Sequence, residues 1–242
     1  MSATPSPLSI AVLVSGTGRG SNLGALIDAC AHGEIHGKIV LVIGTRRDAP
    51  ALERADAAGV PVAVVSPRQY ADDEEGYANA LLRLLDRSQV DLICLAGYLR
   101  KLPAKVVTAY AGRILNIHPS LLPLFGGQGM YGLHVHQAVL ESGMKVSGCT
   151  VHFVDEHYDT GPIVIQTPVP VLDNDTPETL AARILPEEHR AYVRAVQLFA
   201  AGRLRIDGRR VRILPETQAA QSADELEIAA YQEPTVSERR KP

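Results

Sequence analysis

The stretch that decides the fold is LSIAVLVSGTGRGSNLGALIDAC, residues 8–30. It opens with the aliphatic run Leu8–Val14, which is typical of a buried strand. A glycine-rich turn follows, and apolar residues then recur at helical spacing over Ser21–Cys30, with Ser21 as a favourable N-cap. A strand, a glycine turn and a helix in this order indicate an α/β fold.

The same alternation continues to about residue 118. The sequence predicts strands at Ile39–Ile43, Val62–Val65, Val90–Ala96 and Arg113–Ile117, and helices at Pro50–Ala58, Ala71–Asp86 and Pro103–Tyr110. This alternation predicts a doubly wound, mostly parallel sheet. Ligands bind beyond the carboxyl ends of such strands, so chemistry is expected in the loops after Val14, Ile43, Ala96 and Ile117.

Beyond residue 118 the pattern changes to one that predicts an antiparallel C-terminal extension of the same sheet. We expect one domain over residues 8–214 and a flexible, polar tail over 215–242. The predicted elements are a helix at His134–Glu141, strands at Val146–Val154 and Pro162–Val171, a helix at Thr176–Ala200 interrupted or capped near Pro186, and an arginine-rich hairpin at Arg203–Leu214.

Composition narrows the class of protein. The 242 residues are 46% hydrophobic and 21% charged, which is ordinary for a globular protein. The formal net charge of −3 disfavours a protein built mainly to bind nucleic acid. Three cysteines without metal-ligand spacing, and no signal or membrane-spanning run, predict a cytoplasmic protein that does not bind membranes.

The first candidate site is the glycine loop between the first strand and the first helix, Ser15–Asn22. Glycines let a ligand approach the backbone, and the helix end offers free N–H groups and a positive dipole, which favours a phosphate. The loop lacks both the lysine of a P-loop and the spacing of a dinucleotide fingerprint. The alternative is a tight turn without a ligand.

Two further motifs carry polar side chains. Asn116 and His118 lie two apart in a predicted strand and so face the same side, where an amide donor and an imidazole suit an oxyanion and a proton transfer. The run DEHYDTG, residues 155–161, would present a carboxylate that raises the pKa of His118. The alternatives are a polar strand end and a solvated turn.

A metal site and a serine hydrolase are both disfavoured. His134 and His136 form an H-x-H pair at the start of a helical pattern, where residues two apart point in different directions. Ser120 lacks the G-x-S-x-G context of a serine nucleophile.

Six segments together resemble the folate-dependent phosphoribosylglycinamide (GAR) formyltransferase family. They are VSG…GSNL (14–23), DLICLAGYLRKL (91–102), YAGRILNIHPSLLP (110–123), GMYGLHVHQAVLESG (129–143), GCTVHFVDEHYDTGPIVIQ (148–166) and EEHRAYV (187–193). The resemblance spans about residues 8–205. It implies a formyltransferase-like Rossmann-type fold and transfer of the formyl group of 10-formyltetrahydrofolate to the amine of GAR, in de novo purine biosynthesis and without a metal.

The resemblance also implies roles for single residues. Asn116, His118 and Asp159 match the catalytic trio, Asp159 because it lies two residues before Gly161-Pro162. The GAR-binding residues would be Gly20, Ser21 and Asn22 at the phosphate, together with Leu185, Pro186, Glu187 and Glu188, of which Glu188 would contact the ribose. The 10-formyltetrahydrofolate site would comprise Leu99, Arg100, Lys101, Leu102, Asn116, Asp155, Glu156, His157, Tyr158 and Asp159. Residues 8–117 would thus form the GAR phosphate-binding half and residues 118–214 the folate-binding half.

The chain departs from the family pattern at several positions. The glycine loop is longer than the common form, so Arg19 is either an extra residue or a further phosphate contact. Gln128 stands where a lysine is frequent, and Thr160 where a second glycine is common. A folate-contacting arginine of some members falls near Glu74, and Arg68 is the nearest basic substitute.

Three rival functions share the fold. A formyltetrahydrofolate hydrolase normally carries an N-terminal regulatory domain, whereas this chain starts directly with its first strand. A methionyl-tRNA formyltransferase carries a C-terminal domain, and only about 28 residues follow Leu214. A non-catalytic phosphate sensor would need only the glycine loop. We therefore expect GAR and 10-formyltetrahydrofolate as the ligands of a monomer or homodimer.

Overall fold

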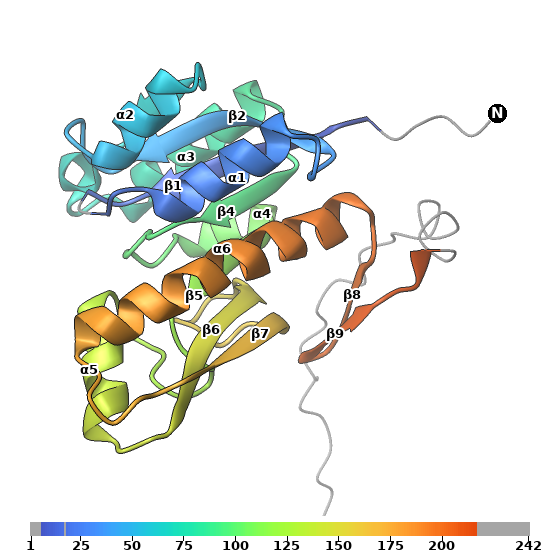
Figure 1. Cartoon of the computed structure of the whole chain (residues 1–242). Coiled ribbons are helices and arrows are strands. Elements are labelled where there is room, and N and C mark those ends of the chain that lie inside the picture. The colour runs from blue at the N-terminus through green and yellow to red at the C-terminus, as the bar shows by residue number, and fades with distance from the viewer. Residues whose placement is uncertain (1–5, 17, 217–242) are drawn as a thin grey trace, which may run out of the picture.

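The computed structural model describes residues 6–16 and 18–216, so all of the predicted tail from residue 217 lies outside the described part. A single sheet runs through the molecule, with helices on both of its faces (Figure 1). The strands are β1 (Leu8–Val14), β2 (Gly37–Gly44), β3 (Val62–Val64), β4 (Leu92–Leu95), β5 (Ile114–His118), β6 (Val146–Phe153), β7 (Ile163–Pro170), β8 (Leu204–Asp207) and β9 (Arg210–Ile213). The helices are α1 (Ser21–Ala31), α2 (Pro50–Ala57), α3 (Glu74–Arg87), α4 (Ala104–Ala109), α5 (Leu133–Glu141) and α6 (Pro177–Ala200), with a 3₁₀ turn at Pro67–Tyr70.

The strand order is β3-β2-β1-β4-β5-β6-β7-β9-β8. The five strands β1 to β5 are parallel to one another. Strand β6 runs antiparallel to β5, and β7 runs antiparallel to β6, as the sequence predicts. The hairpin β8–β9 joins β7 through one parallel pair, Ile163 with Arg210. The doubly wound sheet with an antiparallel extension is therefore confirmed.

Two hydrophobic cores explain why the buried part of β1, residues 10–14, is entirely aliphatic. Its alternate residues Ile10, Val12 and Val14 belong to the core that includes residues of α1, α2 and α6. The residues between them, Ala11 and Leu13, belong to the core that includes residues of α3 and α4. A strand covered on both faces has no solvent side, so the polar alternation of a half-exposed strand is absent.

The start of α1 differs from the prediction, because the N-cap is Gly20 and Ser21 is already helical. Gly20 has φ 69°, in the left-handed region that glycine tolerates best. A Cβ at this position would also lie 2.8 Å from the Cβ of Ala51 in α2. Glycine is therefore required for both its conformation and its small size. The backbone at the start of α1 packs directly against α2.

Two other helix predictions need correction. The predicted helix Ala71–Asp86 begins only at Glu74, because the Asp73 side chain caps it by accepting a hydrogen bond from Gly76 N. The predicted interruption of the last helix is wrong, since α6 runs without a break through Pro186. Pro186 has no backbone N–H, so the carbonyl of Ala182 loses its helical hydrogen bond, but Ala182 is exposed and water can replace the donor. The buried residues Ile184 and Glu188 hold the helix against the rest of the protein.

Tyr192 of α6 ties the helix to the centre of the sheet. Its hydroxyl lies 3.0 Å from both Leu95 O in β4 and Leu115 O in β5, and the side chain is fully buried. We expect Tyr192→Phe to lower the free energy of unfolding by about 1 kcal/mol, because a buried hydrogen bond is lost at nearly constant volume. Urea unfolding at pH 7.5 measures this, and an unchanged midpoint would show that the hydroxyl does not stabilise the fold.

Candidate active site

A cleft of about 580 Å³ lies at the carboxyl ends of β1, β4 and β5, where the topology predicts it. The loops after Val14, Ala96 and Ile117 contribute to its wall, whereas the loop after Ile43 does not. The wall is completed from segments far away in the sequence. It comprises Gly18–Asn22, Ala96–Leu99, Asn116–Pro119, Gly127–Gly132, His136, Tyr158, Asp159, Leu185 and Glu188.

One end of the cleft is formed by the start of α1. Gly20, Ser21 and Asn22 line it together with Glu188 from α6, so the predicted phosphate residues and this acidic residue do meet. Asn22 Nδ2 donates a hydrogen bond to Glu188 Oε2 at 2.8 Å. Burial raises the pKa of Glu188, and the hydrogen bond from Asn22 partly offsets this rise.

The two ring nitrogens of His118 face different groups. Its Nε2 lies 2.9 Å from the Phe125 carbonyl oxygen, which can only accept, so Nε2 carries a proton. Its Nδ1 lies 3.6 Å from Asp159 Oδ2, which is longer than a hydrogen bond. In a neutral His118, Nδ1 is therefore the unprotonated nitrogen. It accepts no hydrogen bond from the described residues.

The expected rise in the pKa of His118 is wrong for the protein without ligand. Burial lowers this pKa below its usual 6.5, and the charge of Asp159 and the bond to Phe125 O only partly offset the effect. The residue is 4% exposed, so desolvation of the cation dominates. His118 is thus mostly neutral at pH 7, with Asp159 limiting how far the pKa falls.

Asp159 joins three parts of the site. Its Oδ2 accepts a hydrogen bond from Gly127 N at 2.8 Å, and its two oxygens lie 3.6 Å from His118 Nδ1 and from His152 Nε2. Burial alone would raise its pKa, but the nearby imidazoles of His152 and His118 and the hydrogen bond from Gly127 N lower it below the usual value. Asp159 therefore stays ionised at neutral pH.

His152 is a site residue that the sequence analysis did not identify. It lies opposite Asn116 in the antiparallel pairing of β6 with β5. Its Nδ1 lies 2.8 Å from Phe153 O and must donate, so its Nε2 is free to accept from Asn116 Nδ2 at 3.1 Å. His152 thus orients the amide of Asn116. The signal for this pair is the strand register, which the sequence alone did not reveal.

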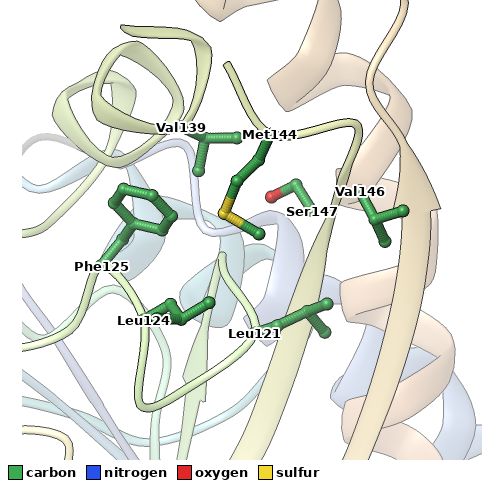
Figure 2. Close-up of a pocket in the computed structure, with 7 residues that line it drawn as sticks. All are labelled: Leu121, Leu124, Phe125, Val139, Met144, Val146 and Ser147. Atoms are coloured by element: carbon green, nitrogen blue, oxygen red, sulfur yellow. The ribbon is translucent and has the colours of Figure 1, made fainter. Parts of the chain in front are cut away.

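The loop that holds Phe125 against His118 is anchored by apolar packing. Behind it lies a small pocket lined by seven residues of the loop, of α5, of β6 and of the turn between α5 and β6 (Figure 2). The side chains of Phe125 and Met144 point toward the same interior space in this view, with Ser147 beside them. The gap is too narrow for a water molecule, so the packing fixes the carbonyl that orients His118.

The predicted folate residues are only partly gathered at the cleft. Leu99, Tyr158 and Asp159 line it with Asn116, and the Tyr158 hydroxyl accepts a hydrogen bond from Lys101 N at 3.0 Å. Leu102 is buried in a core instead. Of the other residues predicted to bind folate, five do not line the wall: Arg100, Lys101, Asp155, Glu156 and His157. Of those predicted to bind GAR, Pro186 and Glu187 do not line it. Arg68 and Glu74 are also absent from the wall.

His136 of α5 also lines the cleft, and it is 3% exposed with no partner for its Nδ1 in the described structure. Burial, together with the nearby His118, lowers its pKa to about 4. The unfolded chain therefore binds this proton near pH 6.5 and the folded protein only near pH 4. The stability that neutral His136 contributes is lost as the pH falls between these values.

We expect the free energy of unfolding to fall by about 2 kcal/mol more in the wild type than in His136→Leu between pH 7.5 and pH 5. The leucine variant has no titratable group at position 136, so this part of the pH dependence disappears. Urea unfolding at both pH values measures the difference. Parallel pH profiles for the two proteins would contradict the assignment.

Two classes of feature are not found in the described residues. Across residues 6–16 and 18–216, no three His, Cys, Asp or Glu side chains are grouped so that they could hold a metal ion. Within the same ranges, no helix is long and apolar enough to cross a membrane.

The chain matches known proteins over most of its length. The family model for formyl transferase matches residues 8–196. The chain is 44% identical over 219 residues to the chloroplastic phosphoribosylglycinamide formyltransferase of Arabidopsis thaliana, covering 89% of this chain and 72% of the relative. It is 40% identical over 199 residues to the phosphoribosylglycinamide formyltransferase of Escherichia coli, covering 82% and 90%.

A solved structure agrees with these matches. The crystal structure of glycinamide ribonucleotide transformylase 1 from Symbiobacterium toebii superposes with a TM-score of 0.82 at 48% identity, covering 89% of this chain and 98% of that one. The resemblance drawn from the sequence motifs is confirmed.

Proposed function

Because the chain belongs to the formyl transferase family, we propose that Asn116, His118 and Asp159 transfer a formyl group within the cleft described above. The reaction takes the formyl group from 10-formyltetrahydrofolate to the amine of GAR, and gives formyl-GAR and tetrahydrofolate in de novo purine (IMP) biosynthesis. The observation that carries the residue assignment is that these three side chains share one cleft with the N-terminal end of α1.

The two substrates are assigned to the two ends of the cleft. The GAR phosphate binds at Gly20, Ser21 and Asn22, where α1 offers free N–H groups and the positive end of its dipole. The folate binds between Leu99 and the loop that carries Tyr158 and Asp159. The formyl carbon and the GAR amine then meet near Asn116 and His118.

The first step uses the neutral state of His118. The GAR amine attacks the formyl carbon, the new C–N bond forms, and the proton released from the amine moves to His118 Nδ1, directly or through a water. The tetrahedral oxyanion that results accepts hydrogen bonds from Asn116 Nδ2 and from the imidazolium. Asp159 stabilises the imidazolium by its charge at 3.6 Å.

The second step returns the proton. The tetrahedral intermediate collapses, the bond from the formyl carbon to N10 of the folate breaks, and His118 Nδ1–H protonates that nitrogen. The products are formyl-GAR and tetrahydrofolate, and the enzyme returns to its starting protonation state. The Phe125 carbonyl keeps Nε2 protonated throughout, so one nitrogen of His118 performs both transfers.

The assignment is tested with purified protein and 10-formyltetrahydrofolate, with and without GAR. Release of tetrahydrofolate that requires GAR and produces formyl-GAR supports transfer. Release at the same rate without GAR indicates a hydrolase, and no release in either case indicates a phosphate-binding protein without this activity.

We further propose a cytoplasmic monomer or homodimer that does not bind nucleic acid or membranes.

A further inference from the structure

The charges that face the cleft do not match the substrate assigned to it. Among the described residues of its wall, Asp159 and Glu188 are acidic, and Arg19 is the one side chain with a permanent positive charge. His118 and His136 both have lowered pKa values because they are buried, so neither supplies a stable cation at pH 7. A phosphate monoester carries a charge of about −1.5 to −2 at this pH.

Backbone groups alone leave this charge largely uncompensated. The N-terminal end of α1 is equivalent to about half a positive charge. Two carboxylates share the same cleft, even though burial raises the pKa of Glu188 and Asn22 binds one of its oxygens. A cationic side chain beside Gly20–Asn22 would compensate the charge that the helix end leaves, and among the described residues of the cleft wall only Arg19 offers one.

The position of Arg19 is set by the backbone around it. It directly precedes Gly20, whose left-handed conformation and close approach to Ala51 pin the chain at the start of α1. Arg54 Nε donates to the Arg19 carbonyl oxygen at 3.4 Å, a long hydrogen bond that also ties the loop to α2. The Arg19 side chain itself is exposed and forms no ion pair with the rest of the described chain.

We propose that Arg19 binds the phosphate of GAR and sets the preference of the enzyme for a phosphorylated substrate. This inference rests on the proposed function. A guanidinium forms paired hydrogen bonds with phosphate oxygens, and the guanidinium of Arg19, which lines the cleft, has no hydrogen-bond partner among the described residues. The longer glycine loop of this chain thus adds a ligand to the phosphate site.

The test compares Arg19→Ala and Arg19→Lys with the wild type. For Arg19→Ala we expect the KM for GAR to rise about 10- to 100-fold, as for the loss of one hydrogen-bonded ion pair, with kcat and the KM for 10-formyltetrahydrofolate within about twofold. Arg19→Lys keeps the charge and loses the planar fork, so its KM for GAR lies between the two. Arg47→Ala is the matched control, since Arg47 is exposed in the next loop of the sheet and does not line the cleft.

A binding measurement separates this inference from the proposed function. Ribose 5-phosphate is titrated calorimetrically against each protein, and the affinity is expected to fall about 10-fold or more in Arg19→Ala and to stay unchanged in Arg47→Ala. If the wild type transfers formyl to GAR but Arg19→Ala keeps its KM for GAR and its affinity for ribose 5-phosphate, the role of Arg19 is refuted while the function stands. If the wild type shows no GAR-dependent transfer, the proposed function fails first.

Discussion

His118→Ala is expected to lower kcat for formyl transfer by about 10²–10⁴, with GAR binding retained. The imidazole is the proton acceptor in the first step and the donor in the second, and no other described residue of the cleft wall lies in the same position between Asn116 and Asp159. The phosphate end of the cleft is built by α1 and does not contain His118, so the Kd for GAR should change by less than about threefold. Steady-state kinetics and calorimetry measure the two effects.

His32→Ala is the control for this variant, because His32 is exposed at the end of α1 outside the cleft. Alanine also removes the donor to Phe125 O, so a loss of activity through misfolding must be excluded by a cooperative urea transition. Added imidazole should restore part of the lost rate if the cavity admits it. A folded His118→Ala enzyme with wild-type kcat would overturn the catalytic assignment.

Asp159→Asn is expected to lower kcat by about 10²–10³ and to move the acid limb of the pH profile to lower pH. Activity requires neutral His118, so kcat/KM falls as the pH drops through the pKa of that residue, below 6.5. Asp159 raises this pKa against the effect of burial, and removing its charge therefore lowers the pKa further. The rate falls because the imidazolium formed during the reaction loses its counter-charge.

The asparagine keeps the structural role of Asp159. It can still accept from Gly127 N, and it tolerates the left-handed conformation of this residue, φ 55°, better than most side chains do. Asp173→Asn serves as the control, since this carboxylate is exposed, pairs with Lys145 and lies outside the cleft wall. A purely structural Asp159 would predict no displacement of the pH profile, and that result would remove it from the catalytic trio.

Local sequence information was sufficient for the parts of the site that lie within one segment. The glycine loop at the start of α1 and the Asn116–His118 pair on β5 are each encoded by spacing, and the structure brings both to the same cleft. The position of Asp159 came from a family resemblance, and the structure puts its carboxylate 3.6 Å from His118. The first two assignments needed only the period of a strand and the ends of a helix, whereas that of Asp159 needed the resemblance.

Other features could not be read from the sequence, because they depend on the burial of each group and on the pairing of distant strands. The pKa of His118 follows from how much water the fold removes, and the neighbouring carboxylate alone predicted the wrong direction. The uninterrupted course of α6 through Pro186 reflects packing of its buried face, which outweighs a local helix-breaking preference.

By itself, the sequence determined the parallel sheet, the glycine entry into α1 and the identity of the polar side chains, because these depend on periodicity and on the conformational range of single residues. Only the tertiary structure decided which of those side chains meet. The register of β6 on β5 puts His152 beside Asn116, and the fold leaves Arg19 as the one permanent cation among the described residues of a cleft that holds two carboxylates. Both depend on long-range packing, since charge balance and hydrogen-bond partners in a cleft are properties of the assembled chain.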